Sequence, residues 1–442
     1  MENDITLNIE SILKVLIMRR EDLTGRLRQP YSPEKGCGVM RVPNAGYENI
    51  WFVVPPDPPQ DVPPDLPIGP LGKAINIIQG RPHWSQASGL DMLAAYLFAR
   101  REAVASSRME GTWSTIDNVL TPGEVHDDGE GKSERQSVRG YATALEYGYS
   151  KIAENGVLAL TTELVCELHD KVMSKDPSFL GVAGRIRAPG LPGDVVQIGG
   201  GGRKEDSIYN PTPPEHVARC LDSVMSWIHD ELLIELGEAG MGVSLPIRMA
   251  IGHAHFEAVH PFSDGNGRVG RMLWPLQIMA SGHLPLFLSG YVEQNRNEYG
   301  RALQEAQKQL SYGRIVKFVC EAIIASDEEE TLTKAIIGNL PEIWKHRGKF
   351  RKGSAALKTL GLLIKMPIMT ANLLSSELDV SFQAASSALN SLQDKGIVRE
   401  RTGYGRNRIF AAEEVISVLA RPFGEDPEIA LEGARRSLKL ES

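Results

Sequence analysis

A twelve-residue segment, HPFSDGNGRVGR at 260–271, most restricts what this chain can form. Apolar residues recur at helical spacing on both sides of it. Because Pro261 disfavours the helical conformation for the residue before it, the first helix should end at about Val259. The segment therefore predicts two helices joined by a tight turn, with His260 at the end of the first helix.

The turn carries groups suited to a polyphosphate. Gly265 and Gly267 allow positive φ and close backbone approach, which is the geometry of an anion-binding nest. Arg268 and Arg271 fall near the start of the second helix, where a cation faces the positive end of the helix dipole and costs roughly 0.3–1 kcal/mol. An anion there would offset that cost, and Asp264 offers the hard oxygen ligand that Mg²⁺ on a diphosphate prefers. A histidine beside such a site can act as general base for a hydroxyl nucleophile.

The segment resembles the Fic motif, HxFx(D/E)GNGRxxR, and matches it at every specified position. The resemblance implies a mostly α-helical Fic-type domain and a protein adenylyltransferase, a nucleotidyltransferase that moves AMP from ATP to a hydroxyl group of itself or of another protein. It implies His260 as the catalytic base, Asp264 as the Mg²⁺ ligand and Phe262 as a core anchor. The resemblance assigns ATP contacts to Glu110, Val259, Gly265, Asn266, Gly267, Arg268, Val269, Gly270, Arg271, Asn295 and Tyr299.

Two alternatives concern the chemistry of this segment. The related Doc-type kinases have a lysine where this chain has Gly267, so the resemblance favours AMP transfer over phosphorylation. A zinc site from His253, His255 and His260 is the other alternative. We expect structural hydrogen bonds for the first two histidines instead, because His255 points away from the shared helix face and the chain has no HExxH pattern.

A short β-branched run between glycines and prolines predicts a small β-hairpin or flap. It resembles the flap of the Fic family, to which a segment of the target protein binds by strand addition. A plain structural hairpin is the alternative. The residues concerned are Val195, Val196, Gln197 and Ile198.

Helical spacing before Gly111 predicts a helix that ends at Glu110. Its last turn, SSRMEG, resembles the inhibitory motif of the family, (S/T)xxxE(G/N), in Ser106, Glu110 and Gly111. The resemblance implies that Glu110 pairs with Arg271 and holds ATP in an unproductive pose; the alternative is a solvated glutamate. Family members of this kind commonly carry an asparagine soon afterwards, near the place of Arg139 here.

Short helical segments followed by a glycine-centred hairpin at 354–412 resemble a winged helix-turn-helix. The chain has a net charge of -8, so DNA binding would need a local basic patch. The predicted wing offers one, but its third helix has no basic residue before Lys395, so DNA binding and docking to a protein or a second copy both remain open. The wing residues are Arg399, Arg401, Arg406 and Arg408.

The composition is that of a folded protein without a membrane span, and four scattered cysteines favour a reducing, cytoplasmic location. Two functional alternatives to the adenylyltransferase remain: a DNA-binding regulator whose Fic domain senses nucleotide, and an enzyme that removes AMP with the same site. The predicted secondary structure includes an extended proline-rich arm at 54–70, an acidic loop at 122–133, and helices at 137–155, 161–175 and 214–236. The predicted division is an N-terminal segment with the proline-rich arm (1–84), an inhibitory helix (85–111), a Fic catalytic domain (112–345), the winged helix-turn-helix (354–412) and a C-terminal tail (413–442).

Overall fold

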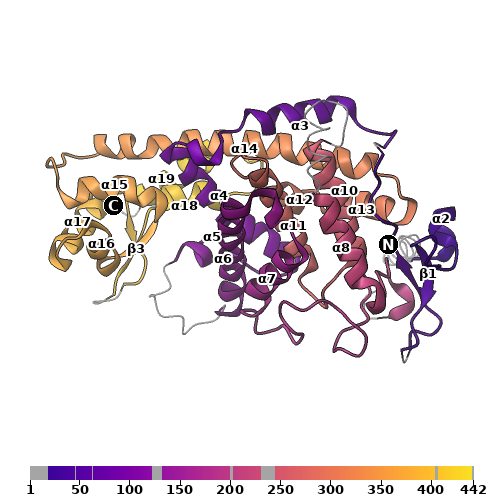
Figure 1. The fold of residues 1–442 in the computed structure, drawn as a ribbon. Coiled ribbons are helices and arrows are strands. Elements are labelled where there is room, and N and C mark those ends of the chain that lie inside the picture. The colour runs from indigo at the N-terminus through magenta and orange to yellow at the C-terminus, as the bar shows by residue number, and fades with distance from the viewer. Residues whose placement is uncertain are drawn as a thin grey trace, which may run out of the picture. The chain divides into compact units, whose positions relative to one another are not determined.

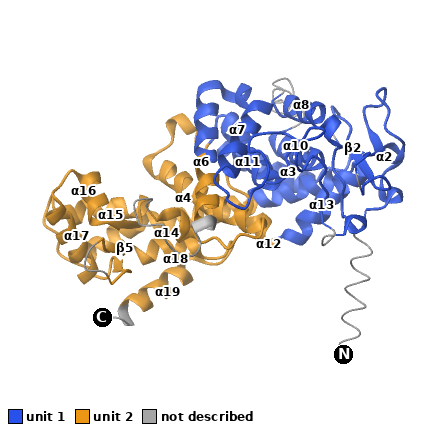
Figure 2. Cartoon of the chain, turned by 90° about the horizontal axis from the view of Figure 1, so that it is seen from below, with its two compact units in different colours: residues 1–80, 144–283, 295–323 blue, residues 81–143, 284–294, 324–442 orange. Residues whose placement is uncertain are grey.

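The structure, a computed structural model, describes residues 18–44, 46–61, 63–121, 132–199, 203–229, 244–403 and 407–440. The chain divides into two compact units, and neither is contiguous in sequence (Figure 2). Unit 1 comprises residues 1–80, 144–283 and 295–323, and unit 2 comprises residues 81–143, 284–294 and 324–442. The predicted catalytic segment 112–345 thus contributes to both units. The core of the predicted acidic loop and the end of the helix predicted at 214–236 lie outside the described residues.

Unit 1 is built around one helix, α10 (Leu245–Val259), in which every residue from Pro246 to Val259 is buried (Figure 1). A helix that is buried along its length must be covered on all sides by other elements. Accordingly α10 packs against four other helices of the unit. These are α3 (Ile68–Gly80), α8 (Val217–Ile228), α11 (Asn266–Ala280) and α13 (Arg296–Gln309).

The two helices predicted around residues 260–271 are present. Helix α10 ends at Val259 and α11 begins at Asn266, and the indole of Trp274 on α11 donates to the Met249 carbonyl on α10 at 3.0 Å. The side of α11 is covered by α7 (Thr162–Met173). The turn between α10 and α11 is therefore held by two buried helices.

The N-terminal part of unit 1 contains elements that the sequence did not predict. Helix α2 (Gly25–Arg28) packs on a two-stranded antiparallel sheet of β1 (Gly38–Arg41) and β2 (Trp51–Val54). The proline-rich arm follows in an extended course along α8, since Asp57 accepts from Ser223 at 2.7 Å and the Pro59 carbonyl accepts from Trp227 at 3.1 Å. The arm ends earlier than predicted: Pro70 lies in the first turn of α3, where proline is tolerated.

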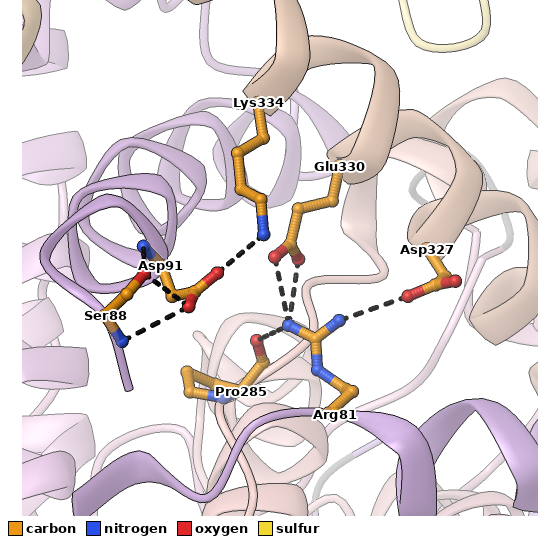
Figure 3. Close-up of polar contacts among 7 residues, drawn as sticks. All are labelled: Arg81, Ser88, Asp91, Pro285, Asp327, Glu330 and Lys334. Atoms are coloured by element: carbon orange, nitrogen blue, oxygen red, sulfur yellow. Dashed lines mark hydrogen bonds and ion pairs between the residues drawn. The ribbon is translucent and has the colours of Figure 1, made fainter. Parts of the chain in front are cut away.

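Unit 2 contains the helix predicted to end at Glu110. This helix, α4 (Gly89–Met109), begins with a capping box between Ser88 and Asp91, and Asp91 also accepts from Lys334 at 2.6 Å (Figure 3). Near the start of α4, Arg81 forms an ion pair with Glu330 at 3.0 Å (Figure 3). The two partners, Lys334 and Glu330, both lie on α14 (Gly313–His346). This helix therefore fixes the position of the first turn of α4 and of the segment before it.

The middle of α4 is tied down by Glu102, a buried carboxylate. It accepts from the backbone N–H of Ser289 at 2.9 Å and from the Ser289 hydroxyl at 2.6 Å, at the start of α12 (Ser289–Gln294). The hydroxyl of Tyr141 on α6 (Lys132–Asn155) is 3.3 Å away. Arg101, on the next position of α4, pairs with Glu329 at 2.5 Å.

The C-terminal part of unit 2 has the predicted helices and hairpin. Three helices lie beside a three-stranded antiparallel sheet with the order β3-β5-β4, in which Phe410 pairs with Met369 and Glu400. Strand β3 was not predicted as a strand. The elements are α15 (Ala355–Lys365), β3 (Ile368–Thr370), α16 (Ala371–Leu378), α17 (Phe382–Asp394), β4 (Arg399–Glu400) and β5 (Ile409–Ala411).

The predicted tail is a packed part of unit 2. Residues 413–440 form α18 (Glu413–Ala420) and α19 (Pro427–Leu440), which pack on each other. Glu414, fully buried, accepts from Trp344 at 2.6 Å and pairs with Arg347 at 2.6 Å and Arg435 at 2.7 Å. A buried carboxylate is stable only when donors are held around it, as these three side chains are. The segment 413–440 is therefore an ordered part of the core of unit 2. Across the described ranges, no helix combines the length and apolar character needed to cross a bilayer.

Candidate active site

The site begins with an unusual backbone conformation at His260. This residue caps α10 with φ 51° and ψ 63°, in the left-handed region that non-glycine residues rarely adopt. The guanidinium of Arg187 holds the turn, donating to the His260 carbonyl at 2.8 Å and to the Val259 carbonyl at 3.0 Å. The His260 side chain is 20% exposed, so its ring is accessible while its backbone is fixed.

Phe262 and Asn266 close the turn on itself. The Asn266 side chain accepts from the Phe262 N–H at 2.8 Å and donates to the Phe262 carbonyl at 2.9 Å. Phe262 is fully buried, as expected for a core anchor. Because both polar atoms of the Asn266 side chain bind the backbone of Phe262, this side chain fixes the shape of the turn.

His169, which the sequence did not single out, supports the turn from α7. Its ring stacks on Phe262 with centroids 3.8 Å apart. Nδ1 accepts from the Gly184 N–H at 2.8 Å, so Nε2 carries the proton and donates to the Asp264 carbonyl at 3.0 Å. Burial lowers the pKa of His169 to about 4, which keeps the ring neutral and this tautomer intact.

Arg268 is held by a buried ion pair. Its guanidinium is 3.0 Å from the Asp176 carboxylate, and the two side chains are 4% and 8% exposed. Burial opposes ionisation of Asp176, but hydrogen bonds from Ser178 and Arg268 outweigh it and lower the pKa. Arg268 is the third residue of α11, so a fixed cation lies where helix N–H groups also have no partner within the helix. This arrangement favours an anionic ligand.

Asp264 is exposed and lies at the tip of the turn. One carboxylate oxygen, Oδ1, accepts from the Gly265 N–H at 2.6 Å. The other oxygen, on an exposed side chain, can reach a ligand. The described part of the chain contains no group of three or more His, Cys, Asp or Glu side chains that could hold a metal. A single carboxylate fits Mg²⁺ that takes its other ligands from phosphates and water.

An open pocket of about 310 Å³ borders Asp264 and Ser263. Its other walls come from two loops of unit 1, and Leu180 in one of them is 94% exposed. The exposed face of the turn therefore has room for a ligand larger than a single ion. The loop residues are Ser178, Phe179, Leu180, Gly181, Pro192 and Gly193.

The flap predicted at 195–198 is smaller than a hairpin. Its one described β-contact is a bridge between Ile198 and Tyr209, with the Ile198 N–H 2.9 Å from the Tyr209 carbonyl. Gln197 braces the flap by donating to the Asn210 side chain at 2.8 Å. The side chains of 195–198 are half-buried, and a single bridge takes the place of the expected ladder among the described residues.

The neighbouring histidines have structural partners, as expected. His253 Nε2 lies 2.6 Å from the Tyr299 hydroxyl, and His255 Nε2 lies 2.9 Å from the Tyr312 hydroxyl. Burial lowers the pKa of both histidines to about 4. Tyr299, a predicted nucleotide contact, is thus buried with its hydroxyl bound to His253. Asn295 lies half-buried at the start of α13.

The remaining predicted ATP contacts of unit 1 lie on α10 and α11. Val259, Val269 and Arg271 are buried. Gly270 has a steric role, since a Cβ there would lie 3.0 Å from the Glu257 carboxylate. Gly265, with φ 78°, needs the left-handed conformation that glycine allows.

In unit 2, the predicted inhibitory motif occupies the end of α4. Ser106 is fully buried, Glu110 is the exposed C-cap residue, and Gly111 adopts φ 85° as predicted for a helix end. Arg139 donates to the Asn118 carbonyl at 3.1 Å and to the Thr121 carbonyl at 2.7 Å. Arg139 therefore fixes the end of the short helix α5 (Ile116–Leu120).

Comparison with known proteins agrees with this site. Residues 159–277 match the Fic/DOC family, and residues 88–150 match the Fic/DOC family N-terminal region. The two matches contain the whole turn and the end of α4, and define a protein of the Fic type. The chain belongs to the Fic/DOC family.

The similar curated proteins are named as adenylyltransferases. Protein adenylyltransferase fic-1 of Caenorhabditis elegans is 31% identical over 180 residues, which cover 40% of this chain and 30% of the relative. The probable protein adenylyltransferase aq_aa38 of Aquifex aeolicus is 31% identical over 130 residues, covering 27% of this chain and 36% of the relative. The chain thus matches about a third of the length of these relatives.

Two solved structures are also similar. Fic-1 (residues 134–508) from C. elegans has a TM-score of 0.46 at 23% identity, covering 59% of this chain and 70% of that one. A Fic family protein from Desulfovibrio desulfuricans has a TM-score of 0.45 at 19% identity, covering 80% of this chain and 98% of that one.

Proposed function

We propose that the chain is a protein adenylyltransferase that transfers AMP from ATP to a hydroxyl group of a target protein. The observation that carries this proposal is the turn at 260–267, in which a histidine in a strained left-handed conformation stands beside a helix start with a fixed arginine. The names of the similar curated proteins support the same activity.

In the proposed reaction, the target hydroxyl oxygen attacks the α-phosphorus of ATP. The bond from that phosphorus to the bridging oxygen of the β-phosphate breaks, and pyrophosphate leaves with the electron pair. His260 takes the hydroxyl proton. Arg268 and the N–H groups at the start of α11 bind the phosphates, so catalysis consists mainly of positioning and charge stabilisation. Bound Mg²⁺ would offset phosphate charge, and Asp264 would hold it.

A test of this proposal uses the intact mass of the protein and of proteins in a lysate after incubation with ATP and Mg²⁺. We expect a gain of one AMP group on a hydroxyl residue. Asp264→Ala should abolish the gain at low Mg²⁺, because no other carboxylate cluster of the described residues can replace this ligand. Asp170→Ala is the matched control, because it removes a carboxylate on α7 outside the turn. It should leave the gain intact. A gain in the Asp264→Ala protein equal to that of the unaltered protein would remove Asp264 from the proposal.

We further propose that Glu110 restrains the reaction. This proposal rests on the motif that Ser106, Glu110 and Gly111 share with the inhibitory segment of the family. In that motif the glutamate pairs with the second arginine of the Fic motif, here Arg271, and occupies the place of the γ-phosphate. Removal of AMP is the second candidate activity, with Glu110 activating a water molecule.

We propose that residues 354–412 form a winged helix-turn-helix that docks a protein. Among the described wing arginines, Arg401 pairs with Glu413 at 2.8 Å and Arg408 donates to Asn390 at 2.9 Å. Arg406 lies outside the described residues. At the start of α17, Phe382 is 57% exposed. Engaged arginines and an exposed aromatic side chain favour a protein partner over DNA phosphates. Retardation of a DNA duplex by the protein at low salt would instead favour the DNA-binding alternative.

A further inference from the structure

A buried glutamate lies one helical turn before the proposed base. Glu257 on α10 has one carboxylate oxygen, Oε2, 3.7 Å from His260 Nδ1. Its other oxygen, Oε1, is buried and, like His260 Nδ1, has no hydrogen-bond partner among the residues that the structure describes. Two polar atoms that lack partners thus belong to side chains that face each other. Such contacts are often long without substrate and shorten in the reacting complex.

Glu257 is held as a carboxylate. Burial opposes its ionisation, but the contact with His260 and the nearby charge of Arg271 lower the pKa. A carboxylate can accept hydrogen bonds and cannot donate them. The His260 nitrogen that faces it must therefore carry the proton.

Two other neighbours of Glu257, His253 and Gly270, do not compete for this role. His253 Nε2 lies 4.0 Å from Oε1, but this nitrogen already bonds to the Tyr299 hydroxyl at 2.6 Å. Gly270 on α11 leaves the space for the carboxylate, because a Cβ there would lie 3.0 Å from Oε1. A buried charge with an unfilled acceptor is costly, and a purely structural glutamate is normally fully hydrogen-bonded. The arrangement is better explained by the histidine it faces.

We propose that Glu257 is a positioning residue for His260, an inference that rests on the proposed function. The carboxylate accepts the Nδ1 proton and so holds the ring in the tautomer with a free lone pair on Nε2. Nε2 then takes the proton of the target hydroxyl as the oxygen bonds to the α-phosphorus. The imidazolium formed in this step lies beside the carboxylate, which stabilises its charge. Glu257 itself touches neither ATP nor the target.

Kinetics of two variants test this role. Glu257→Leu should lower kcat by about 10- to 150-fold, with KM for ATP unchanged. This factor corresponds to the free energy that one hydrogen bond to a charged group contributes. Glu257→Gln keeps an acceptor for Nδ1–H but loses the charge, so its kcat should fall between those of Glu257→Leu and the unaltered protein. In the His260→Ala background, Glu257→Leu should lower the residual rate no further, because both changes act through one contact.

The control variant is His255→Gln. It alters another buried polar side chain of α10, bound to Tyr312, and should lower the melting temperature without changing the kcat of the folded protein. If Glu257→Leu and His255→Gln lower kcat equally, Glu257 acts only through the stability of α10.

A spectroscopic readout separates this inference from the proposed function. The chain has 10 histidines, and the ¹⁵N signals of His260 are identified by their loss in His260→Ala. We expect Nδ1 to carry the proton in the unaltered protein and the population to shift towards Nε2–H in Glu257→Leu. A tautomer shift in a protein that never transfers AMP would leave the positioning role standing and refute the proposed function. AMP transfer with the same kcat and the same tautomer in all Glu257 variants would overturn the positioning role alone.

Discussion

His260→Ala should reduce AMP transfer by about 10²- to 10⁴-fold while the affinity for ATP stays within a few fold. A general base contributes this much to rate because it acts as the proton moves, and it adds little to binding of the ground state. The phosphate-binding groups, including Arg268 in its ion pair with Asp176, lie outside the changed side chain. The measurement is the initial rate of target modification, with ATP affinity measured by titration of the same preparation.

The backbone at position 260 requires a control, because alanine in the left-handed conformation is disfavoured. His260→Asn provides it, since asparagine tolerates this conformation and is not a base at neutral pH. Both variants should be equally slow. Transfer at the unaltered rate in either one would refute the assignment of His260 as the base.

Glu110→Gly should raise modification of the target or of the protein itself. If the carboxylate holds an arginine that the γ-phosphate needs, its loss removes one hydrogen bond to a charged group. Such a bond contributes about 1.5–3 kcal/mol, which corresponds to an increase of about 10- to 150-fold. Most substitutions at a functional site lower activity, so an increase supports a brake specifically. The rate is measured at saturating ATP and Mg²⁺.

The double variant Glu110→Gly, Arg271→Ala identifies the partner. The gain should disappear, because both changes act on one contact and their effects should not add. Glu102→Gln is a control on the same helix, since Glu102 binds Ser289 and Tyr141 within unit 2. If Glu110→Gly is as slow as the unaltered protein or slower, Glu110 is no brake, and activation of water for AMP removal becomes the better account.

Local sequence rules predicted the turn and its two helices well. Pro261 marks the end of α10 and the glycines mark the start of α11, because these residues act through their own backbone conformations. Gly111 predicts the end of α4 for the same reason. The helices and the hairpin of 355–411 were predicted from helix N-caps and from the spacing of apolar residues. Both signals are local in sequence and do not depend on distant contacts.

The supports of the turn could not be predicted in this way. His169, Asp176 and Arg187 hold Asp264, Arg268 and His260 from segments 73 to 95 residues away in sequence, and nothing in their local pattern marks a partner. His169 gave one weak signal, a histidine among the apolar positions of α7. The sequence does not predict the sheet of β1 and β2, because each strand has only four residues. It does not predict the packed helices of 413–440, because their packing depends on distant partners such as Trp344 and Arg347, which bind Glu414.

The most direct measurement compares ATP labelled on the α-phosphate with ATP labelled on the γ-phosphate. It uses the unaltered protein, Glu110→Gly and His260→Ala. The account predicts that protein retains the α-label, most strongly in Glu110→Gly and least in His260→Ala, and that no protein retains the γ-label. Retention of the γ-label would show phosphoryl transfer and contradict the account, as would the absence of both labels from a Glu110→Gly protein that binds ATP.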